Sequence, residues 1–524
     1  MPHFSEKSVA EDYFIEKLKA KGWRFVPADE LERESFEEPL LIPNLIRSLK
    51  KLNAKLDITD EEIKKVLNEL KLKSSTVEGI KGVLNLFKQG VPIKFEKDRL
   101  VKYVKLFDYE NPEQNDFIAS RQVVYNSGRG EIRTDIMLYV NGIPLVDIEC
   151  KNPASFSESW FDAYKQIKEY EQKIPELYKY VQIGVAAEQI VKYFAIVPWE
   201  EETRIYEWKE QEQNDPVDST IEMLAPNRLL DILRNYLFFR IEFGSSTKVI
   251  TRYMQYRASE KIVKRVLDNF NGTEDKNKGL IWHWQGSGKT LTMIFAVNKL
   301  YRNEILENPT IFFVVDRQDL QIQLEQEFNA LDIPRVEVID SIEALRKTLK
   351  HDEGKGKRGI MITLIHKFRA EELDALQKEL EAASKTNSTI LNRKNVLAFV
   401  DEGHRTQYGT MAAQMRNILR KAFFFAFTGT PIAKGGKDTY EAFSYPPQEK
   451  YFDKYFITDS IRDGFTVKIV YQPRLEELHL KKEQLEAFLE IQEEELPEEF
   501  KEKINESVKK KLTASKVILE NPEN

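Results

Sequence analysis

Three residues in the first third of the chain have the types and spacing needed to hydrolyse a phosphodiester bond. Asp135 lies in one apolar stretch, and Glu149 and Lys151 close the next one. Because alternate residues of a strand face the same side, Glu149 and Lys151 project together, and a turn at 141–142 would bring Asp135 beside them. Two carboxylates and a backbone carbonyl suit Mg²⁺, which activates water and neutralises charge on a phosphate. We therefore predict Asp135 and Glu149 as catalytic metal ligands, with Lys151 orienting the water or stabilising the transition state.

Two residues further along the chain strengthen this prediction. Gln166 and Tyr170 are four positions apart in an expected helix over 158–173, so they share a face and can hold DNA or brace the site. Glu11 is a further possible acid of the site, but we favour its role in a capping box with Ser8. An ordinary salt-bridged strand would also explain the acidic and basic pattern taken alone.

A second group of residues can bind a nucleoside triphosphate. Residues 283–290 read HWQGSGKT, between an apolar strand and an expected helix. Glycines let backbone N–H groups turn onto a phosphate, and the helix N-terminus adds its positive dipole end. The lysine would reach the β- and γ-phosphates, and the threonine would hold Mg²⁺. The predicted ATP-binding residues of this loop are Gly286, Ser287, Gly288, Lys289 and Thr290.

Later residues on the same expected sheet narrow the class of ATPase. Asp401 and Glu402 follow an apolar strand, where Asp401 would hold Mg²⁺ through water and Glu402 would polarise the attacking water. Upstream, Gln255 and Arg257 offer an amide and a guanidinium for adenine and phosphate contact. A further strand closes with three residues predicted to couple nucleotide state to nucleic acid: Thr428, Gly429 and Thr430.

Apolar periodicity places these residues on an α/β scaffold. Residues 1–200 combine helices with consecutive strands, 201–245 form a linker with a helical bridge at 229–243, and 246–474 alternate strands with helices, which indicates a parallel sheet. Residues 475–524 form an acidic helical tail. The strands expected before residue 200 are 117–119, 122–125, 135–140, 143–150 and 179–186, and those after 245 are 279–284, 311–315, 360–364, 396–400 and 423–428.

Composition limits the remaining possibilities. The 524 residues carry a net charge of −7, of which the tail contributes −6 with 14 Glu and 8 Lys, so a nucleic-acid surface must be a local patch. One cysteine excludes an internal disulfide and a cysteine-cluster metal site. No apolar run approaches the ~20 residues that span a bilayer, and no signal peptide is visible, so we expect a cytoplasmic protein without membrane contact.

The two groups of motifs resemble known families. The first is similar to the PD-(D/E)xK nuclease core with its Q-x-x-x-Y element, except for threonine at 134 where proline is common. The second resembles the first motor domain of superfamily 2 helicases. The predicted fold is therefore a PD-(D/E)xK nuclease-like domain followed by a RecA-like parallel-sheet P-loop motor domain. The order of the two domains resembles the N-terminal half of the restriction subunit of type I restriction endonucleases. Four short sequence segments carry the same resemblance, at residues 141–145, 283–290, 401–406 and 463–467.

This resemblance carries several implications. It accounts for His283, which stands where other phosphate loops have glycine. It implies a type I site-specific deoxyribonuclease subunit that acts on double-stranded DNA with methyltransferase and specificity subunits, using Mg²⁺ and ATP for translocation and cleavage. Such motors place ATP between two RecA-like domains, so the tail is expected to be a linker or the start of a missing second domain. We expect this chain to bind ATP but to hydrolyse it slowly alone.

Two other functions remain open. A helicase-like ATPase with an inactive nuclease fold would bind ATP and DNA without cutting, and alanine at Asp135 would change nothing. A non-catalytic subunit that docks DNA or partners would tolerate Lys289→Ala.

Overall fold

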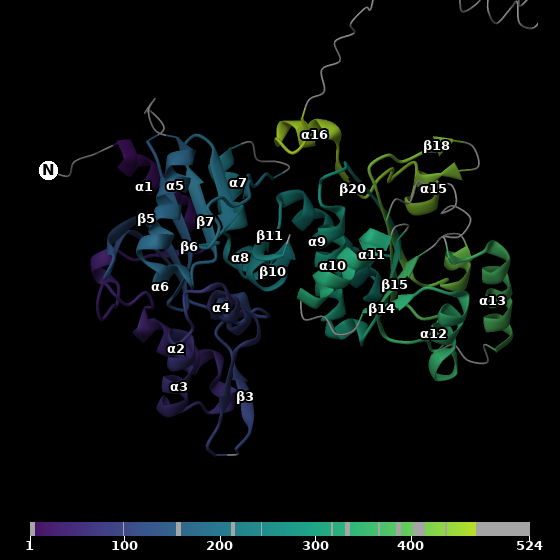
Figure 1. The fold of residues 1–524 in the computed structure, drawn as a ribbon, viewed down its shortest axis with the longest axis horizontal. Coiled ribbons are helices and arrows are strands. Elements are labelled where there is room, and N and C mark those ends of the chain that lie inside the picture. The colour runs from purple at the N-terminus through teal and green to yellow at the C-terminus, as the bar shows by residue number, and fades with distance from the viewer. Residues whose placement is uncertain are drawn as a thin grey trace, which may run out of the picture. The chain divides into compact units, whose positions relative to one another are not determined.

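The computed structural model describes residues 6–467, apart from 98, 153–158, 211–214, 243, 316–317, 331–335, 365–366, 384–388, 402–413 and 435–436 (Figure 1). The tail predicted over 475–524 lies outside the described residues. Within the described part of the chain, no helix is long and apolar enough to cross a membrane.

The first of two large sheets carries the predicted nuclease residues. Its seven strands have the order β1-β4-β5-β6-β7-β8-β9, antiparallel from β4 to β6 and parallel between β6 and β7. Helix α1 (Glu6–Ala20) packs in the apolar core on one face, and α5 (Trp160–Lys173) and α6 (Pro175–Tyr178) pack in a core on the other. The strands are β1 (Arg24–Phe25), β4 (Phe117–Ser127), β5 (Gly130–Val140), β6 (Ile143–Cys150), β7 (Ile183–Ala187), β8 (Val191–Ala195) and β9 (Ile205–Tyr206).

Most of the elements predicted for this region are confirmed, with two differences. The two expected strands at 117–125 form one strand, β4, which continues through an irregularity where Gln122 has φ 56°. The capping box at Ser8 is wrong, because α1 already includes Glu6 and residues 8 and 11 therefore lie inside the helix. Glu11 is consequently available for another role.

A helical module with a β-ribbon lies between β1 and β4 in the chain. Its helices are α2 (Ile42–Leu52), α3 (Asp60–Lys71) and α4 (Val77–Gln89). Threonine side chains cap the last two, and Thr59 forms a capping box with Glu62. Strands β2 (Val91–Lys94) and β3 (Val101–Val104) pair antiparallel as a separate two-stranded ribbon, which projects beside α3 in Figure 1.

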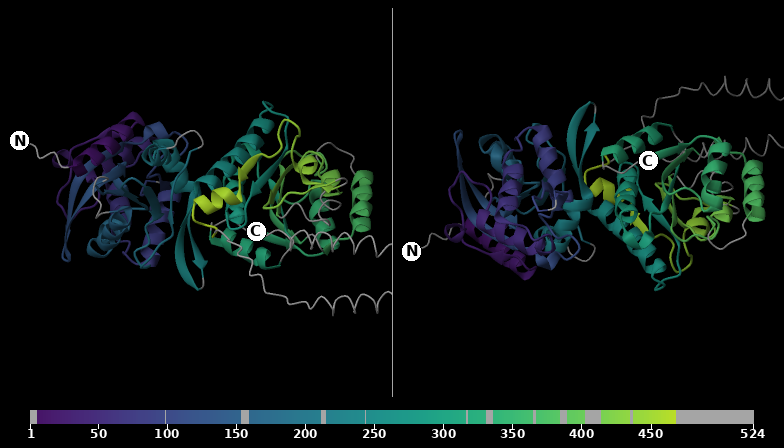
Figure 2. Two further views of the ribbon diagram at one scale, coloured as in Figure 1. Left: turned by 90° about the horizontal axis from the view of Figure 1, so that it is seen from above. Right: turned by 90° about the horizontal axis from the view of Figure 1, so that it is seen from below.

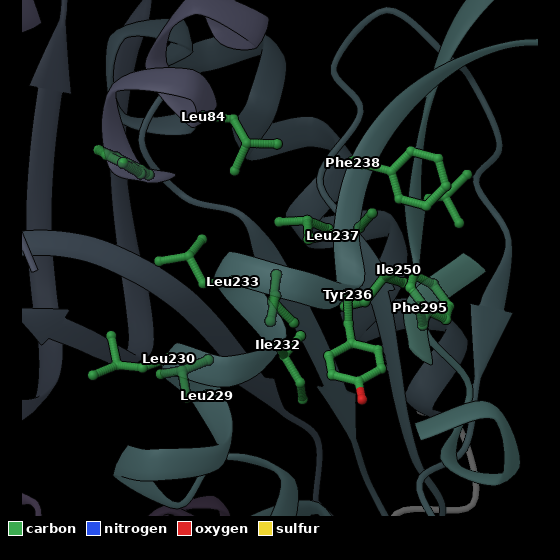
Figure 3. Close-up of a cluster of buried hydrophobic side chains, with 14 of the residues drawn as sticks. Leu84, Leu229, Leu230, Ile232, Leu233, Tyr236, Leu237, Phe238, Ile250 and Phe295 are labelled. Atoms are coloured by element: carbon green, nitrogen blue, oxygen red, sulfur yellow. The ribbon is translucent and has the colours of Figure 1, made fainter. Parts of the chain in front are cut away.

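The segment between the two large sheets is more ordered than a linker. It supplies β9 to the first sheet, then α7 (Pro216–Met223), α8 (Pro226–Asp231) and a π-helical turn, η4 (Ile232–Tyr236). The helical bridge predicted to reach residue 243 ends at Tyr236, because β10 (Leu237–Glu242) pairs with β11 (Ser245–Ile250) as a hairpin. Figure 3 shows the apolar core of this segment, in which Leu84 of α4, Leu233 of η4 and Phe295 of α10 (Lys289–Tyr301) belong to one buried cluster.

The second large sheet confirms the predicted parallel arrangement. All its strand pairs are parallel, in the order β14-β15-β13-β16-β17-β12-β20. Helices α9, α10 and α11 lie on one face of this sheet and α12, α13 and α15 on the other (Figures 1 and 2). Their side chains join two separate apolar cores. The strands are β12 (Lys278–His283), β13 (Thr310–Val315), β14 (Val336–Ile339), β15 (Gly359–Leu364), β16 (Val396–Asp401), β17 (Phe423–Thr428) and β20 (Asp453–Tyr455). The helices are α9 (Tyr253–Phe270), α10 (Lys289–Tyr301), α11 (Gln318–Ala330), α12 (Ile342–Gly354), α13 (Ala370–Ala383), α15 (Thr439–Phe443) and α16 (Ile457–Arg462).

Candidate nuclease and nucleotide sites

The register of β5 and β6 brings the two predicted nuclease carboxylates together. Ile136 pairs with Ile148, so Asp135 and Glu149 lie opposite each other. The backbone N–H of Asp135 donates to Glu149 Oε1 at 3.0 Å, and the N–H of Cys150 donates to Asp135 Oδ2 at 2.9 Å. Each carboxylate thus accepts a hydrogen bond from the backbone of the neighbouring strand. This agrees with the prediction that a turn at 141–142 brings Asp135 beside Glu149.

Lys151 is held by the two accessory residues of α5. Its Nζ donates to Gln166 Oε1 at 2.5 Å, the Gln166 amide donates to Tyr170 Oη at 2.5 Å, and that hydroxyl donates to the carbonyl of Arg133 at 3.1 Å. Tyr170 therefore ties α5 to the strand that carries Asp135. Gln166 and Tyr170 brace the ammonium group, which is one of the two roles that their spacing predicted.

The electrostatics of this site are those of carboxylates removed from water. Asp135 is 2% exposed and Glu149 is fully buried. Burial, with the Asp147 and Asp135 carboxylates, raises the pKa of Glu149 well above its usual range. Burial also raises the pKa of Asp147 to about 7, although Tyr178 donates a hydrogen bond to its Oδ2 at 2.5 Å. A divalent cation would offset this accumulation of negative charge.

The two carboxylates are hard oxygen donors of the kind that Mg²⁺ prefers. Glu149 Oε2 is buried and has no hydrogen-bond partner among the described residues, so it retains an oxygen for a hard cation. Asp135 and Glu149 would hold the ion, which would supply an activated water. No group of three or more histidine, cysteine or acidic residues in the described part could hold a metal, so the ion would depend on these two carboxylates and backbone oxygen.

Glu11 belongs to the surroundings of this site, which the capping interpretation missed. It is 4% exposed, and its Oε1 accepts a hydrogen bond from Gln122 Nε2 at 2.8 Å. The same amide donates to Asp135 Oδ1 at 3.3 Å. Gln122 thus bridges Glu11 and Asp135. The positive φ of Gln122 aims this side chain, and the sequence gives no signal for that irregularity.

The phosphate loop has the conformation that its glycines predicted. Gly286 and Gly288 have φ of 77° and 79°, in the left-handed region that favours glycine. Lys289 and Thr290 then begin α10, so the positive end of the helix dipole lies at the loop. Ser287 Oγ is buried without a hydrogen-bond partner in the described part of the chain. These features fit a bound phosphate.

Residues at the start of α9 form hydrogen bonds with the backbone of this loop. Gln255 Nε2 donates to the carbonyl of Ser287 at 3.1 Å, and Gln255 Oε1 accepts from the N–H of Arg252 at 2.9 Å. Arg252 in turn donates to the carbonyl of Gly286 at 3.0 Å. The structure therefore places the predicted Gln255 against the loop backbone, and it adds Arg252, which sequence reasoning missed.

Arg257 contacts an acid that sequence reasoning did not connect with it. Its guanidinium donates two hydrogen bonds of 2.9 Å to Asp453 of β20, and Asp453 Oδ2 also lies 2.7 Å from His283 Nε2. Burial would raise the pKa of Asp453, but its hydrogen bonds with His283 and Arg257 outweigh burial and lower it. Burial lowers the pKa of His283, which favours a neutral imidazole. The histidine that replaces a loop glycine is thus part of a buried ionic network.

The remaining motor residues gather at the carboxyl edge of the sheet. Asp401 ends β16, and β17 lies between β16 and β12, so the acidic strand is not the immediate neighbour of the loop strand. Thr428 ends β17 opposite Trp282, whose Nε1 donates to the carbonyl of Gly429 at 3.1 Å. The N–H of Thr430 donates to Thr428 Oγ1 at 3.1 Å. Glu402 lies outside the described residues.

A cavity of about 990 Å³ opens beside the phosphate loop. Its lining includes Gly286, Gly288 and Thr290, together with Arg252 and Gln255. This volume is at the upper end of the range for small-molecule sites and accommodates a nucleotide.

The structure thus combines a mixed sheet that carries paired buried carboxylates with a parallel sheet that carries a phosphate-type loop. Two family models match it: type I restriction enzyme R protein N terminus over residues 3–203, and SWI2/SNF2 ATPase over residues 254–502. Residues 3–203 are therefore similar to the N terminus of type I restriction enzyme R proteins, and residues 254–502 are similar to SWI2/SNF2 ATPases.

Whole-chain relatives agree with this assignment. The HindI type I restriction enzyme endonuclease subunit of Haemophilus influenzae is 29% identical over 504 residues, 88% of this chain and 45% of the relative. Two candidate type I restriction endonuclease subunits of Methanocaldococcus jannaschii, MjaVIIIP and MjaVIIP, are 30% and 31% identical over 87% and 84% of this chain. They are covered over 45% and 50% of their own lengths, so the chain spans about half the length of the curated relatives it matches. The resemblance to the N-terminal half of these subunits is confirmed.

Proposed function

We propose that the protein is the DNA-cleaving and ATP-dependent DNA-translocating subunit of a type I restriction-modification complex. It would act on double-stranded DNA together with methyltransferase and specificity subunits, using Mg²⁺ and ATP. The proposal rests on one observation above all: a braced pair of buried carboxylates occurs in the same chain as a phosphate loop at the edge of a parallel sheet.

The nuclease proposal assigns roles to the residues of the first sheet, taken as a PD-(D/E)xK domain over residues 1–200. Asp135 and Glu149 would hold Mg²⁺, which supplies the activated water when it is bound. Lys151, positioned by Gln166 and Tyr170, would orient that water or donate to the phosphate oxygens as negative charge develops.

The motor proposal assigns residues 246–474 to a RecA-like domain. The loop Gly286–Thr290 would bind the phosphates, with Thr290 and Asp401 on the metal and Glu402 on the attacking water. Gln255 would sense nucleotide through the loop carbonyl that it contacts, and Arg257 would act through Asp453 and His283. Residues 428–430 would relay nucleotide state to DNA.

A plasmid-cleavage assay tests this function. Full-length protein assembled with purified partner subunits is expected to cut circular DNA only with Mg²⁺ and ATP. Lys151→Ala is expected to abolish cutting while leaving ATP binding intact, and Lys289→Ala is expected to abolish ATP binding and cutting together. Normal cutting by both variants would contradict the proposal.

A further inference from the structure

The helical module and its ribbon have a charge opposite to that of the rest of the protein. Residues 42–105 contain 15 Lys and Arg against 8 Asp and Glu, a net charge of +7 in a chain whose total is −7. The remaining residues therefore sum to −14. A folded module that concentrates positive charge in an acidic protein is a candidate surface for a polyanion.

The ribbon also exposes large apolar side chains. Leu100, Val101 and Tyr103 are 60%, 61% and 57% exposed, three of the largest exposures among apolar residues in the described part. The register places Tyr103 opposite Pro92 on the outer face of the ribbon, whereas Ile93 is buried on the inner face. Side chains of this size on the open face of a two-stranded ribbon contribute nothing to the core.

The basic residues of the ribbon are largely available for a partner. Lys94, Arg99 and Lys105 are exposed and form no ion pair with any described residue. The local acid Glu96 is instead directed toward the helices, where Lys65 of α3 lies 2.9 Å from its Oε1. The ribbon thus presents positive charge at its strands and tip.

We propose that the β2–β3 ribbon is a docking surface for duplex DNA. A two-stranded ribbon fits the width of the major groove. Lys94, Arg99 and Lys105 would contact phosphates on either side, and Tyr103 and Val101 would contact sugars or base edges. A protein partner is less favoured, because lysine is depleted in the cores of protein interfaces, whereas phosphate contacts are made mainly by lysine and arginine.

This inference deepens the proposed function, since it assumes that duplex DNA is the substrate. In this proposal the ribbon, and not the motor domain, holds the duplex for the nuclease site. Binding through the ribbon would be insensitive to sequence, because phosphates carry no sequence information.

The test compares two matched triple variants by fluorescence anisotropy on a mixed-sequence 30-bp duplex in EDTA, over a series of salt concentrations. The first is Lys94→Gln, Arg99→Gln and Lys105→Gln. The control removes the same charges at Arg358→Gln, Lys394→Gln and Lys421→Gln, which precede β15, β16 and β17 and thus lie at the sheet edge opposite the phosphate loop. The full-length protein is used throughout, and thermal melting verifies that every variant folds.

The ribbon variant is expected to lower the slope of log affinity against log salt by about 2.7, which is 0.9 for each lost phosphate contact. The control is expected to keep the wild-type slope. Tyr103→Ser, which removes contact area and no charge, is expected to weaken binding by about threefold or more without changing the slope. If the ribbon variant keeps the wild-type slope, the ribbon does not dock duplex DNA, and the proposed function is unaffected. The same conclusion holds if that variant keeps the slope but loses binding to a protein partner. Absence of duplex binding by the wild type would contradict the proposed function itself.

Discussion

Substitution of two glycines in the phosphate loop gives a sharp test of the loop geometry. Gly286 and Gly288 both have φ near 78°, so alanine at either position costs roughly 1–2 kcal/mol of backbone strain. Their surroundings differ. A Cβ at Gly286 meets nothing within 4 Å, whereas a Cβ at Gly288 overlaps Gln255 Nε2 and lies 3.0 Å from Arg252 Nη2.

The additional cost at Gly288 follows from the contacts that Gln255 would lose. Displacing its amide removes two hydrogen bonds, to Ser287 and Arg252, worth about 1 kcal/mol each. Gly288→Ala is therefore expected to destabilise the motor domain by about 2 kcal/mol more than Gly286→Ala. For a domain of this size the difference corresponds to about 4–8 °C in melting temperature.

Differential scanning fluorimetry without nucleotide measures both variants. The same pair is then compared in a Gln255→Ala background, where the obstructing amide is absent and the difference should nearly vanish. Equal melting temperatures for the two single variants, or a difference that persists without the Gln255 amide, would refute the reasoning.

Three further predictions concern buried and half-buried polar groups. Burial raises the pKa of Glu171 from 4.5 to about 7, so its contribution to stability is complete below about pH 4.5 and is lost as the pH rises through 7. Glu171→Gln has no such titration. In denaturant unfolding, the free energy of unfolding of the variant relative to wild type should therefore rise by up to roughly 3 kcal/mol between pH 4.5 and 8. Asp453→Asn removes the buried carboxylate that pairs with the partly exposed Arg257 and Lys261 and should cost roughly 1.5–3 kcal/mol, whereas an unchanged melting temperature would disprove the network. Gln166→Ala removes the acceptor that positions Lys151 and should slow DNA cleavage by roughly 10–100-fold with no loss of ATP binding; wild-type cleavage would show that the brace is dispensable.

The strands and the two motif groups could be predicted because their signals are local. The apolar run at 396–400 is long enough to be a buried strand, and Asp401 follows it directly, so one segment of sequence specifies both. The pairing of Asp135 with Glu149 needed only a turn between adjacent strands.

The parts that could not be predicted depend on contacts between distant residues. Arg257 and Asp453 are 196 positions apart, and no pattern near either one identifies the other. The position of β17 between the loop strand and the acidic strand is a property of strand order, which periodicity does not encode. Glu11 contacts Gln122 of the nuclease site, and the unusual φ of Gln122 is not specified by nearby glycine or proline.

We propose that one chain joins a nuclease site to an ATP-driven motor, and one experiment measures the two activities separately. Asp135→Ala is assembled with the partner subunits, and ATP hydrolysis and DNA cleavage are measured on the same plasmid in the same reaction with Mg²⁺. Wild-type ATP hydrolysis with no cleavage is expected. Cleavage at the wild-type rate by Asp135→Ala would contradict this proposal.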